Sequence, residues 1–292
     1  MKSAPFDYLR AHDLEHALEL LDQHGDAAKL IAGGQSLVPM MAMRLARPSV
    51  LVDIYRLAGL AKIEPQRDRV LVGAAVRQKQ LLESEPATAA LPLVAAALPW
   101  VGHPPTRSRG TVGGSVAHAD PSAELPLALL VLQGTVVAQS RRKGLRRIAA
   151  TDFFVDLMTT ALAADECLVA TEWPAHAAPR TGTAFEETAI RKGDFALASA
   201  ACQIALDGQG KIASLSLGVG GVGSTPRVFP ELTGRCVGQA PSEENIRALA
   251  SDLAGELDPP GDVHADASFR RHLAKVLASR VIAQAARRAG GQ

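Results

Sequence analysis

The spacing of apolar residues near the N-terminus predicts a small lobe built from helices and strands. Apolar residues fall on one face of a helix that Asp13 can cap and that stops at Gly25. Unbroken apolar runs are typical of buried strands. The elements predicted after this helix are strands over residues 27–31 and 50–54, with a compact helix-like segment over 39–44 between them. We expect this lobe to end near Leu57.

A second lobe is predicted from mixed strand and helix patterns over residues 58–175. The predicted strands cover residues 61–63, 70–74, 135–138 and 168–173, and the predicted helices cover 91–98 and 124–132. Residues 101–107 contain a glycine and two prolines, and therefore predict a loop. Residues 141–147 hold five basic side chains around Gly144, a pattern that favours a solvated turn between strands over a polyanion site.

The C-terminal part changes to strands followed by helices, which indicates an α+β domain. The predicted antiparallel strands cover residues 185–190, 198–206 and 212–219. Two helices close the chain, one capped by Ser242 and the other by Ser268. The short segment 176–180 contains alanines and a proline and predicts a domain linker. The chain is therefore expected to divide into residues 1–175 and 180–288.

Composition excludes several classes of protein. The chain has 292 residues, of which 47% are hydrophobic and 21% charged, so it can bury the cores of two domains. A net charge of +1 gives no electrostatic reason to expect binding to nucleic acid or an anionic membrane. The first ten residues do not resemble a secretory signal. The most apolar segment, 125–138, is shorter than the roughly 20 residues that span a bilayer.

The cysteines are few and far apart, at positions 167, 202 and 236. Because the sequence has no C-x-x-C motif, neither an iron–sulfur cluster nor a structural zinc is expected in this chain. A reducing cytoplasm fits this usage.

Two glycine-rich stretches are the main candidates for a binding site. Residues 31–37 (IAGGQSL) follow a predicted strand, and residues 109–115 (RGTVGGS) repeat the same kind of turn. Glycines leave the backbone accessible, and exposed N–H groups form a concave site for an anion such as phosphate. Each stretch alone is more often an ordinary loop than a ligand site. Together they suggest two walls of one pocket for a long, phosphate-bearing ligand.

A third glycine-rich stretch is not interpreted as a nucleotide site. Residues 218–223 match G-x-G-x-x-G and follow a strand. A dinucleotide fingerprint should then open a helix and be followed about 20 residues later by an acidic residue at a strand end. Here Ser224-Thr225-Pro226 comes next, and Glu243 lies at a predicted helix start. A glycine-rich strand end is the better interpretation.

Several motifs occur together along the chain. They are AGGQSLVP at 32–39, VDI at 52–54, GH at 102–103, RSRGTVGGSVAHADPSAELP at 107–126, RKGDFA at 191–196 and FRRHLA at 269–274. These residues resemble the FAD-binding medium subunit of molybdenum hydroxylases, the class of carbon monoxide dehydrogenase and xanthine dehydrogenase. The resemblance covers nearly the whole chain, and the motif at 107–126 is its most specific part.

The resemblance implies an oxidoreductase subunit with an FAD-binding domain of the p-cresol methylhydroxylase type over 1–175, with lobes over 1–57 and 58–175, and an α+β domain with an antiparallel sheet and helices over 180–288. It also implies partners: a small iron–sulfur subunit and a large molybdenum-cofactor subunit that oxidises the substrate, in a dimer of heterotrimers. Electrons would enter from the iron–sulfur subunit and leave through FAD to an external acceptor. No catalytic residue or metal ligand is implied in this chain.

The same resemblance implies roles for individual residues. The backbone of residues 32–37 would hold the FAD pyrophosphate, residues 111–115 would form the opposing wall, and residues 120–124 would supply acidic and hydroxyl partners. Positions 101, 168 and 192 would lie near the flavin ring. The implied cofactor-binding residues are Ala32, Gly33, Gly34, Gln35, Ser36, Leu37, Val101, Thr111, Gly114, Ser115, His118, Asp120, Glu124, Leu168 and Lys192.

Plainer roles remain open for some of these positions. Asp120 or Glu124 could cap the following helix, Trp100 could be a core residue, and Asp194 could only fix a turn. His103 is as well explained as a loop residue as by a flavin contact. Two other functions also remain open: a scaffold module that binds another phosphate ligand or none, and a self-sufficient flavin oxidase, for which His103 would be the covalent anchor.

Overall fold

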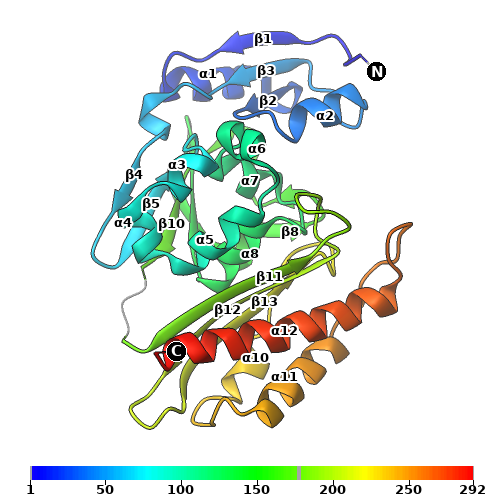
Figure 1. The fold of residues 1–292 in the computed structure, drawn as a ribbon. Helices are drawn as coiled ribbons and strands as arrows, with labels where there is room; N and C mark the ends of the chain where they lie inside the picture. The colour runs from blue at the N-terminus through cyan, green and yellow to red at the C-terminus, as the bar shows by residue number, and fades with distance from the viewer. Residues whose placement is uncertain (1, 176–178, 292) are drawn as a thin grey trace.

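The computed structural model describes residues 2–175 and 179–291 and divides them into three stacked parts (Figure 1). A small N-terminal lobe lies at one end, a second lobe occupies the middle, and a sheet with helices forms the other end. Buried apolar residues group into three clusters that follow these parts closely. The predicted linker 176–180 includes residues 176–178, which lie outside the described residues.

The first lobe is a three-stranded parallel sheet in the order β1-β3-β2. Its elements are β1 (Asp7–Arg10), α1 (Leu14–His24), η1 (Gly25–Ala27), β2 (Ala28–Ile31), α2 (Leu37–Ala42), β3 (Val50–Asp53) and η2 (Ala58–Leu60). Asp13 caps α1 by accepting a hydrogen bond from the amide of His16, as predicted. Strand β1 was not predicted, because it is an edge strand with mostly exposed residues and no apolar alternation.

The second lobe is built on a five-stranded antiparallel sheet in the order β4-β5-β10-β6-β7. Its strands are β4 (Ile63–Pro65), β5 (Arg69–Gly73), β6 (Thr135–Ser140), β7 (Gly144–Ala149) and β10 (Glu166–Pro174), with a separate hairpin of β8 (Phe154–Asp156) and β9 (Thr159–Thr160). Its helices are α3 (Gln78–Leu82), α4 (Glu85–Ala90), α5 (Pro92–Ala97), η3 (Leu98–Trp100), α6 (Pro104–Arg109), α7 (Val112–His118), α8 (Glu124–Val131) and α9 (Ala150–Phe153).

Two predictions in this lobe were wrong. The predicted loop over 101–107 contains the start of α6, because Pro104 and Pro105 occupy the first helical turn, where no backbone N–H is needed. The second glycine-rich stretch is the start of helix α7 rather than a turn. Thr111 caps this helix, so its two glycines lie in a regular first turn.

The basic turn over 141–147 joins β6 to β7, and its charges face carboxylates of the same chain. Arg142 pairs with Asp22 of α1 at 2.6 Å, and Arg146 pairs with Glu166 of β10 at 2.5 Å. The pair with Asp22 joins the second lobe to the first. Exposed pairs of this kind contribute only about 0–1 kcal/mol each, and the segment is a solvated hairpin as predicted.

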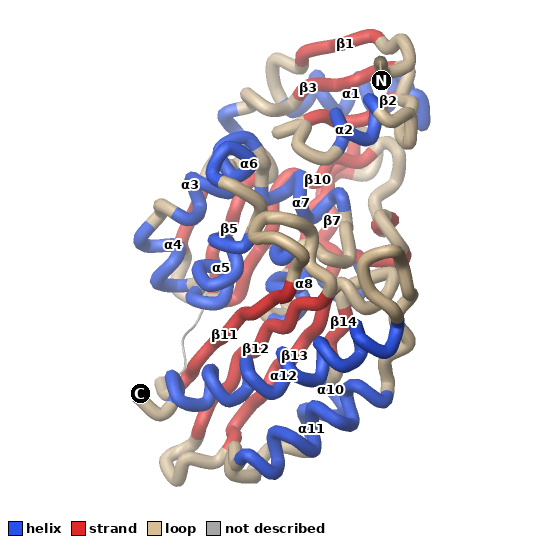
Figure 2. Tube along the Cα trace, turned by 45° about the vertical axis from the view of Figure 1, so that its right-hand side comes forward, coloured by secondary structure: helices blue, strands red, loops and turns tan. Residues whose placement is uncertain are grey.

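The C-terminal part is a four-stranded antiparallel sheet with helices on its outer face (Figure 2). Its elements are β11 (Thr181–Thr188), β12 (Ala198–Leu206), β13 (Ile212–Gly220), β14 (Arg227–Val228), α10 (Pro230–Gly234), α11 (Glu243–Gly255) and α12 (Ala267–Ala289). The cap of α12 is Asp266, which accepts from the amide of Phe269, and not Ser268 as predicted. The glycine-rich stretch 218–223 closes β13, and no helix opens there, in agreement with its rejection as a nucleotide motif.

Helix α8 connects the second lobe to the C-terminal sheet. Every residue from Leu125 to Val131 is buried, because the second lobe covers one side of the helix and strands β12 and β13 cover the other. A helix that is apolar on all sides requires such enclosure. The two halves of the chain therefore share apolar surface around this helix.

No helix in the described part of the chain is long and apolar enough to cross a membrane.

Candidate functional site

The two glycine-rich stretches touch each other in the structure. A Cβ atom built on Gly33 would lie 2.1 Å from the carbonyl oxygen of Arg109 and 2.9 Å from the Cα atom of Gly110. Only glycine fits at position 33, since any side chain would push these backbones apart. The end of β2 and the start of α7 therefore form neighbouring walls of one site, as the sequence suggested.

The first wall presents unused backbone donors. Gly34 has a φ of +68°, which turns the chain from β2 into α2. Within the described residues, none of the amides of residues 33–36 donates a hydrogen bond. The side-chain amide of Gln35 donates to the carbonyl of Gly33 at 3.1 Å, and the hydroxyl of Ser36 makes no capping bond. Consecutive free N–H groups of this kind suit an anion such as a diphosphate.

The second wall is different, because its amides are already paired. The amide of Gly114 donates to Oγ1 of Thr111 at 3.0 Å, and the amide of Ser115 donates to the carbonyl of Thr111 at 3.1 Å. Gly113 packs against β5, where a Cβ would lie 2.5 Å from the Cα atom of Ala74. This wall therefore contributes shape and the side chain of Ser115, and not the exposed amides that the sequence suggested.

His118 and Asp120 follow at the end of α7. Their closest atoms, Nε2 of His118 and Oδ2 of Asp120, are 4.0 Å apart. Burial lowers the pKa of His118, Asp120 opposes this shift, and Lys29 of β2 adds to it. The influence of Lys29 indicates that His118 faces the first lobe. Asp120 is buried and accepts from the amide of Ser122 at 2.8 Å.

Glu124 is the first residue of α8 and is mostly enclosed by protein. Burial raises the pKa of its carboxyl to about 7; Asp120 adds to the shift and Arg107 opposes it. Arg107 in turn donates to the carbonyl of Val101 at 2.8 Å and to that of Gly102 at 2.9 Å. Asp120 does not cap α8, whose N-cap Ala123 has no side-chain bond, so the capping alternative is wrong for Asp120. The carboxyl of Glu124 accepts a hydrogen bond from its own backbone amide in the first turn of the helix, so the capping alternative is not contradicted for Glu124.

Leu168 lies where the pairing of β10 with β6 is interrupted. The register shifts between Leu168 and Ala170, so a bulge interrupts the ladder. The carbonyl of Val169 accepts from the amide of Ala74 at 2.9 Å, and the carbonyl of Ala74 accepts from Gly113 at 3.1 Å. The bulge therefore lies one strand away from the start of α7, with the side chain of Leu168 buried.

Lys192 lies on the loop between β11 and β12. Gly193 beside it has a φ of +89°, and a Cβ there would lie 2.6 Å from the imidazole of His103. The loop thus rests on the residues that follow Val101, whose side chain is buried in the core. Asp194 pairs with Arg191 at 3.0 Å and fixes the turn, as the plainer interpretation proposed.

The predicted residues therefore fall into groups that adjoin one another. Residues 32–37 meet residues 109–115, and the segment 118–124 follows directly and faces both the first lobe and Arg107. Val101 and the Lys192 loop adjoin each other through His103 and Gly193. Trp100 is half-buried, with its ring centroid 6.3 Å from that of Phe185, so it packs at the domain contact.

Some residues at this site were not predicted. Glu187 of β11 is influenced electrostatically by Glu124. Arg107 and Gly110 lie inside a motif that had been quoted, so a closer look at that motif could have included them. Glu187 could not have been found, because only the register of β11 shows which way it faces.

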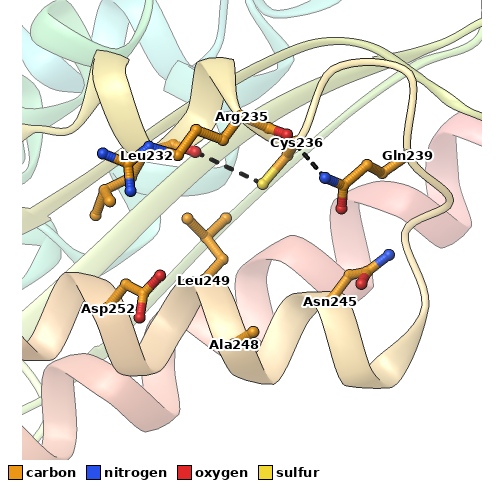
Figure 3. A pocket seen from close by; sticks show the side chains of 8 residues that line it. All are labelled: Leu232, Arg235, Cys236, Gln239, Asn245, Ala248, Leu249 and Asp252. Atoms are coloured by element: carbon orange, nitrogen blue, oxygen red, sulfur yellow. Dashed lines mark hydrogen bonds between the residues drawn. The ribbon is translucent and has the colours of Figure 1, made fainter.

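A cavity of about 140 Å³ lies elsewhere, between α10 and α11 (Figure 3). Its lining residues are Leu232, Arg235, Cys236, Gln239, Asn245, Ala248, Leu249 and Asp252. The thiol of Cys236 donates to the carbonyl of Leu232 at 3.7 Å, and the side chain of Gln239 donates to the carbonyl of Arg235 at 2.9 Å. Both helices lie at the end of the molecule opposite the first lobe, far from the glycine-rich walls (Figure 1).

Comparison with known families matches both halves of the chain. Residues 4–176 match the model of the FAD binding domain in molybdopterin dehydrogenase. Residues 183–285 match the model of the CO dehydrogenase flavoprotein C-terminal domain.

Individual relatives are similar over nearly their whole length. The 6-hydroxypseudooxynicotine dehydrogenase complex subunit alpha of Paenarthrobacter nicotinovorans is 40% identical over 99% of this chain and 97% of that subunit. The nicotine 6-hydroxylase medium subunit of the same organism is 38% identical over 99% of this chain and all of that subunit. A chain of carbon monoxide dehydrogenase from Hydrogenophaga pseudoflava superposes with a TM-score of 0.95 at 32% identity, covering 99% of both chains.

The cap of α7 can be tested directly. Thr111→Val keeps the shape of the side chain but leaves the amide of Gly114 without its acceptor. We expect the free energy of unfolding to fall by about 1 kcal/mol, the usual effect of losing a helix cap. Urea denaturation of the two proteins measures this loss. Thr111→Ser retains the acceptor and serves as the control; equal stability of the Val and Ser variants would contradict the assignment.

Proposed function

The chain belongs to the family of FAD-binding medium subunits of molybdenum hydroxylases, and we propose how its residues serve that role. It is the FAD-binding subunit of an oxidoreductase complex, through which electrons pass to an external acceptor. The observation that supports the proposed site best is the contact of Gly33 with Arg109 and Gly110 beside four unused amides.

The residues at this contact fit the diphosphate of FAD. Free amides at residues 33–36 would donate to phosphate oxygens, and the missing side chain at Gly33 keeps the neighbouring backbone close. Ser36 and Ser115 would add hydroxyl donors, with Ala32 and Leu37 flanking the turn and Gln35 bracing it. Thr111 and Gly114 would hold the opposite wall in shape through their mutual hydrogen bond.

The other proposed contacts lie further along the same site. Burial lowers the pKa of His118, and Asp120 is oriented by the amide of Ser122, so both side chains would be available for hydrogen bonds to the cofactor. Glu124 would accept from hydroxyl groups of the cofactor. The bulge at Leu168 would bring backbone to the flavin ring, with Val101 and the loop of Lys192 on its other sides.

FAD supplies the redox chemistry when bound, since its ring accepts and releases electrons. The chain holds and orients the ring and excludes water from it. Proximity and fixed orientation are the main contributions of a protein to such transfer. No nucleophile or general base in this chain is needed for that task.

The partners follow from the family. Related medium subunits belong to proteins named for nicotine, caffeine, carbon monoxide and xanthine. We propose that this chain likewise works with a small iron–sulfur subunit, which delivers electrons, and a large molybdenum subunit, which oxidises and selects the substrate, in a dimer of heterotrimers.

We propose the domain assignment 1–175 for FAD binding and 180–288 for the C-terminal domain, supported by the separate family matches at 4–176 and 183–285. We also propose a cytoplasmic location, supported by three buried cysteines that remain free thiols.

The alternative functions are not favoured. The scaffold interpretation gains no support from matches to two flavoprotein families. The flavin oxidase interpretation has only His103 as an anchor, an exposed residue that lies against Gly193.

Purification of the native complex tests the function as a whole. We expect this chain to copurify with two other subunits, with one FAD per copy of this chain, and with iron and molybdenum in the same particle. Flavin absorbance and metal analysis by mass spectrometry measure all three. Isolation of the chain without flavin or metal-containing partners would contradict the proposed function.

Gly33→Ala tests the site. The added methyl group would collide with the backbone of Arg109 and separate the two walls. A displacement of this kind typically costs about 1–3 kcal/mol, so we expect the affinity for FAD to fall by a factor between about 5 and 150. Fluorescence titration of the apoprotein with FAD measures the change.

The matched control for this substitution is Gly59→Ala, in the same lobe. A Cβ at Gly59 would meet no atom within 4 Å, so this variant should bind FAD as tightly as the parent protein. If Gly33→Ala bound FAD as well as Gly59→Ala does, the site assignment would be wrong.

A further inference from the structure

Two polar residues, Glu187 and Ser199, lie side by side with Gly220 in a row across the C-terminal sheet, on the face that packs against the second lobe. Glu187 of β11 lies directly opposite Ser199 of β12, and Ser199 lies directly opposite Gly220 of β13. Residues paired in this way point to the same face of a sheet. Glu187 is only 9% exposed and Ser199 is fully buried.

Neither side chain in this row has its hydrogen-bonding capacity filled. Oε2 of Glu187 and Oγ of Ser199 are both buried without a partner. An unpaired ionised carboxylate in such a place is costly, whereas a neutral carboxylic acid costs much less. Burial, assisted by Glu124, raises the pKa of Glu187 to about 8. Buried polar atoms without a hydrogen-bond partner are unusual in folded proteins. Two of them on neighbouring strands indicate a place where a proton or a ligand group can bind.

The row faces the beginning of α8. A Cβ on Gly220 would lie 3.0 Å from the carbonyl of Pro121, and the amide of Gly221 donates to the same carbonyl at 2.8 Å. Glu124 lies three residues after Pro121, and burial raises the pKa of its carboxyl to about 7. Glu124 and Glu187 therefore lie on opposite sides of the contact between the two domains, near enough for Glu124 to act electrostatically on Glu187.

Few charged side chains lie near Glu124 and Glu187. The first residue of α8 is its one acidic position, and α5, which also packs against β11, carries no titratable residue. Asp120 acts on Glu124 from one side and Arg107 from the other. On the opposite face of β11, Glu186 is engaged by Arg280 and Gln284 of α12 and so belongs to a separate cluster. Apart from burial, the carboxyl of Glu124 is therefore the group that acts on the pKa of Glu187, whereas the pKa of Glu124 responds mainly to burial, Asp120 and Arg107.

We propose that Glu187 and Glu124 form a proton-holding pair at the domain contact, and that the pair takes up a proton from solvent when the FAD bound beside it gains electrons. This inference rests on the proposed function, because Glu124 is also assigned to the cofactor site. Arg107 connects the two places: it acts on Glu124 and is bonded to the carbonyls of Val101 and Gly102.

The protons and electrons balance in this scheme. The iron–sulfur partner would supply two electrons to the bound FAD, and the protons taken up by FAD itself would be counted separately from those of the pair. The added negative charge favours the neutral forms of nearby carboxyls. The pair, which shares a proton beforehand, then gains up to one more from solvent and loses it again when the electrons leave for the acceptor. No bond other than the O–H bond on the carboxyl forms or breaks in the pair.

The test is the pH dependence of the reduction potential of FAD bound to the full chain. For a two-electron couple, each proton taken up with the electrons shifts the potential by about 30 mV per pH unit. We expect the slope of the parent protein between pH 7 and 9 to exceed that of Glu187→Gln by up to this amount. Protonation of the ring itself is common to both proteins and cancels in the comparison.

Glu186→Gln is the matched control. It is the same substitution one residue away, on the opposite face of the strand, so it should keep the slope of the parent protein. Equal slopes for all three proteins would overturn the proposal, as would the same decrease in both variants. If the proposed function itself were wrong, the parent protein would bind no FAD, and this result is distinct from equal slopes in proteins that do bind FAD.

A second measurement does not need the cofactor. A carboxyl whose pKa is higher in the folded than in the unfolded chain binds more protons when folded between the two values. The free energy of unfolding of the parent apoprotein should therefore fall as the pH rises from about 5 to 8. Thermal denaturation of Glu187→Gln should show a smaller fall than that of Glu186→Gln. An equal fall in the two variants would contradict the buried, neutral state of Glu187.

Discussion

The missing side chain at Gly33 is the constraint on which the proposed site depends. It allows the turn after β2 to press against the backbone at Arg109 and Gly110, which belong to the other lobe. This contact fixes four unpaired amides next to the start of α7. A larger residue would separate the lobes at the point where a diphosphate is expected to bridge them. The two walls are unequal, since one offers donors and the other offers a tightly packed surface.

Enclosure of α8 is the second constraint, and it explains how the C-terminal sheet is positioned. The helix is apolar on every side except at its first residue, Glu124. Burying its apolar residues contributes to the attraction between the domains, at roughly 25 cal/mol for each Å² removed from water. Glu124 and Glu187 interrupt this apolar contact. Burying two carboxyl groups at such a contact lowers stability and favours their protonated forms. Perturbed pKa values of this kind are common at functional sites.

Much of the architecture could be predicted from local patterns. Buried strands such as β3 and β12 have apolar runs or alternation, and α1 has both a periodic face and the cap at Asp13. Elements with weak patterns were missed. Strand β1 is exposed, and α6 begins with two prolines that read as a loop until the first-turn role of proline is considered. The short helices α3 and α4 have too few residues for a periodic signal.

The candidate site was predictable only in part. Glycine spacing suggested both walls, but it could not show that Thr111 caps a helix or that the amides of the second wall are already paired. Glu187 became visible only through strand register, because it lies one residue along β11 from Glu186, which is on the opposite face and meets α12. Local sequence determines which residues can turn the chain, whereas partners across the fold determine which polar groups remain unused.

Hydrogen exchange followed by mass spectrometry, with and without FAD, tests the central claim most directly. The account predicts that FAD slows exchange strongly in the peptide containing residues 33–37, whose amides are unpaired in the protein alone, and less in the peptide containing residues 111–115, whose amides already have partners. Slower exchange confined to the cavity between α10 and α11, with no change at residues 33–37, would contradict it.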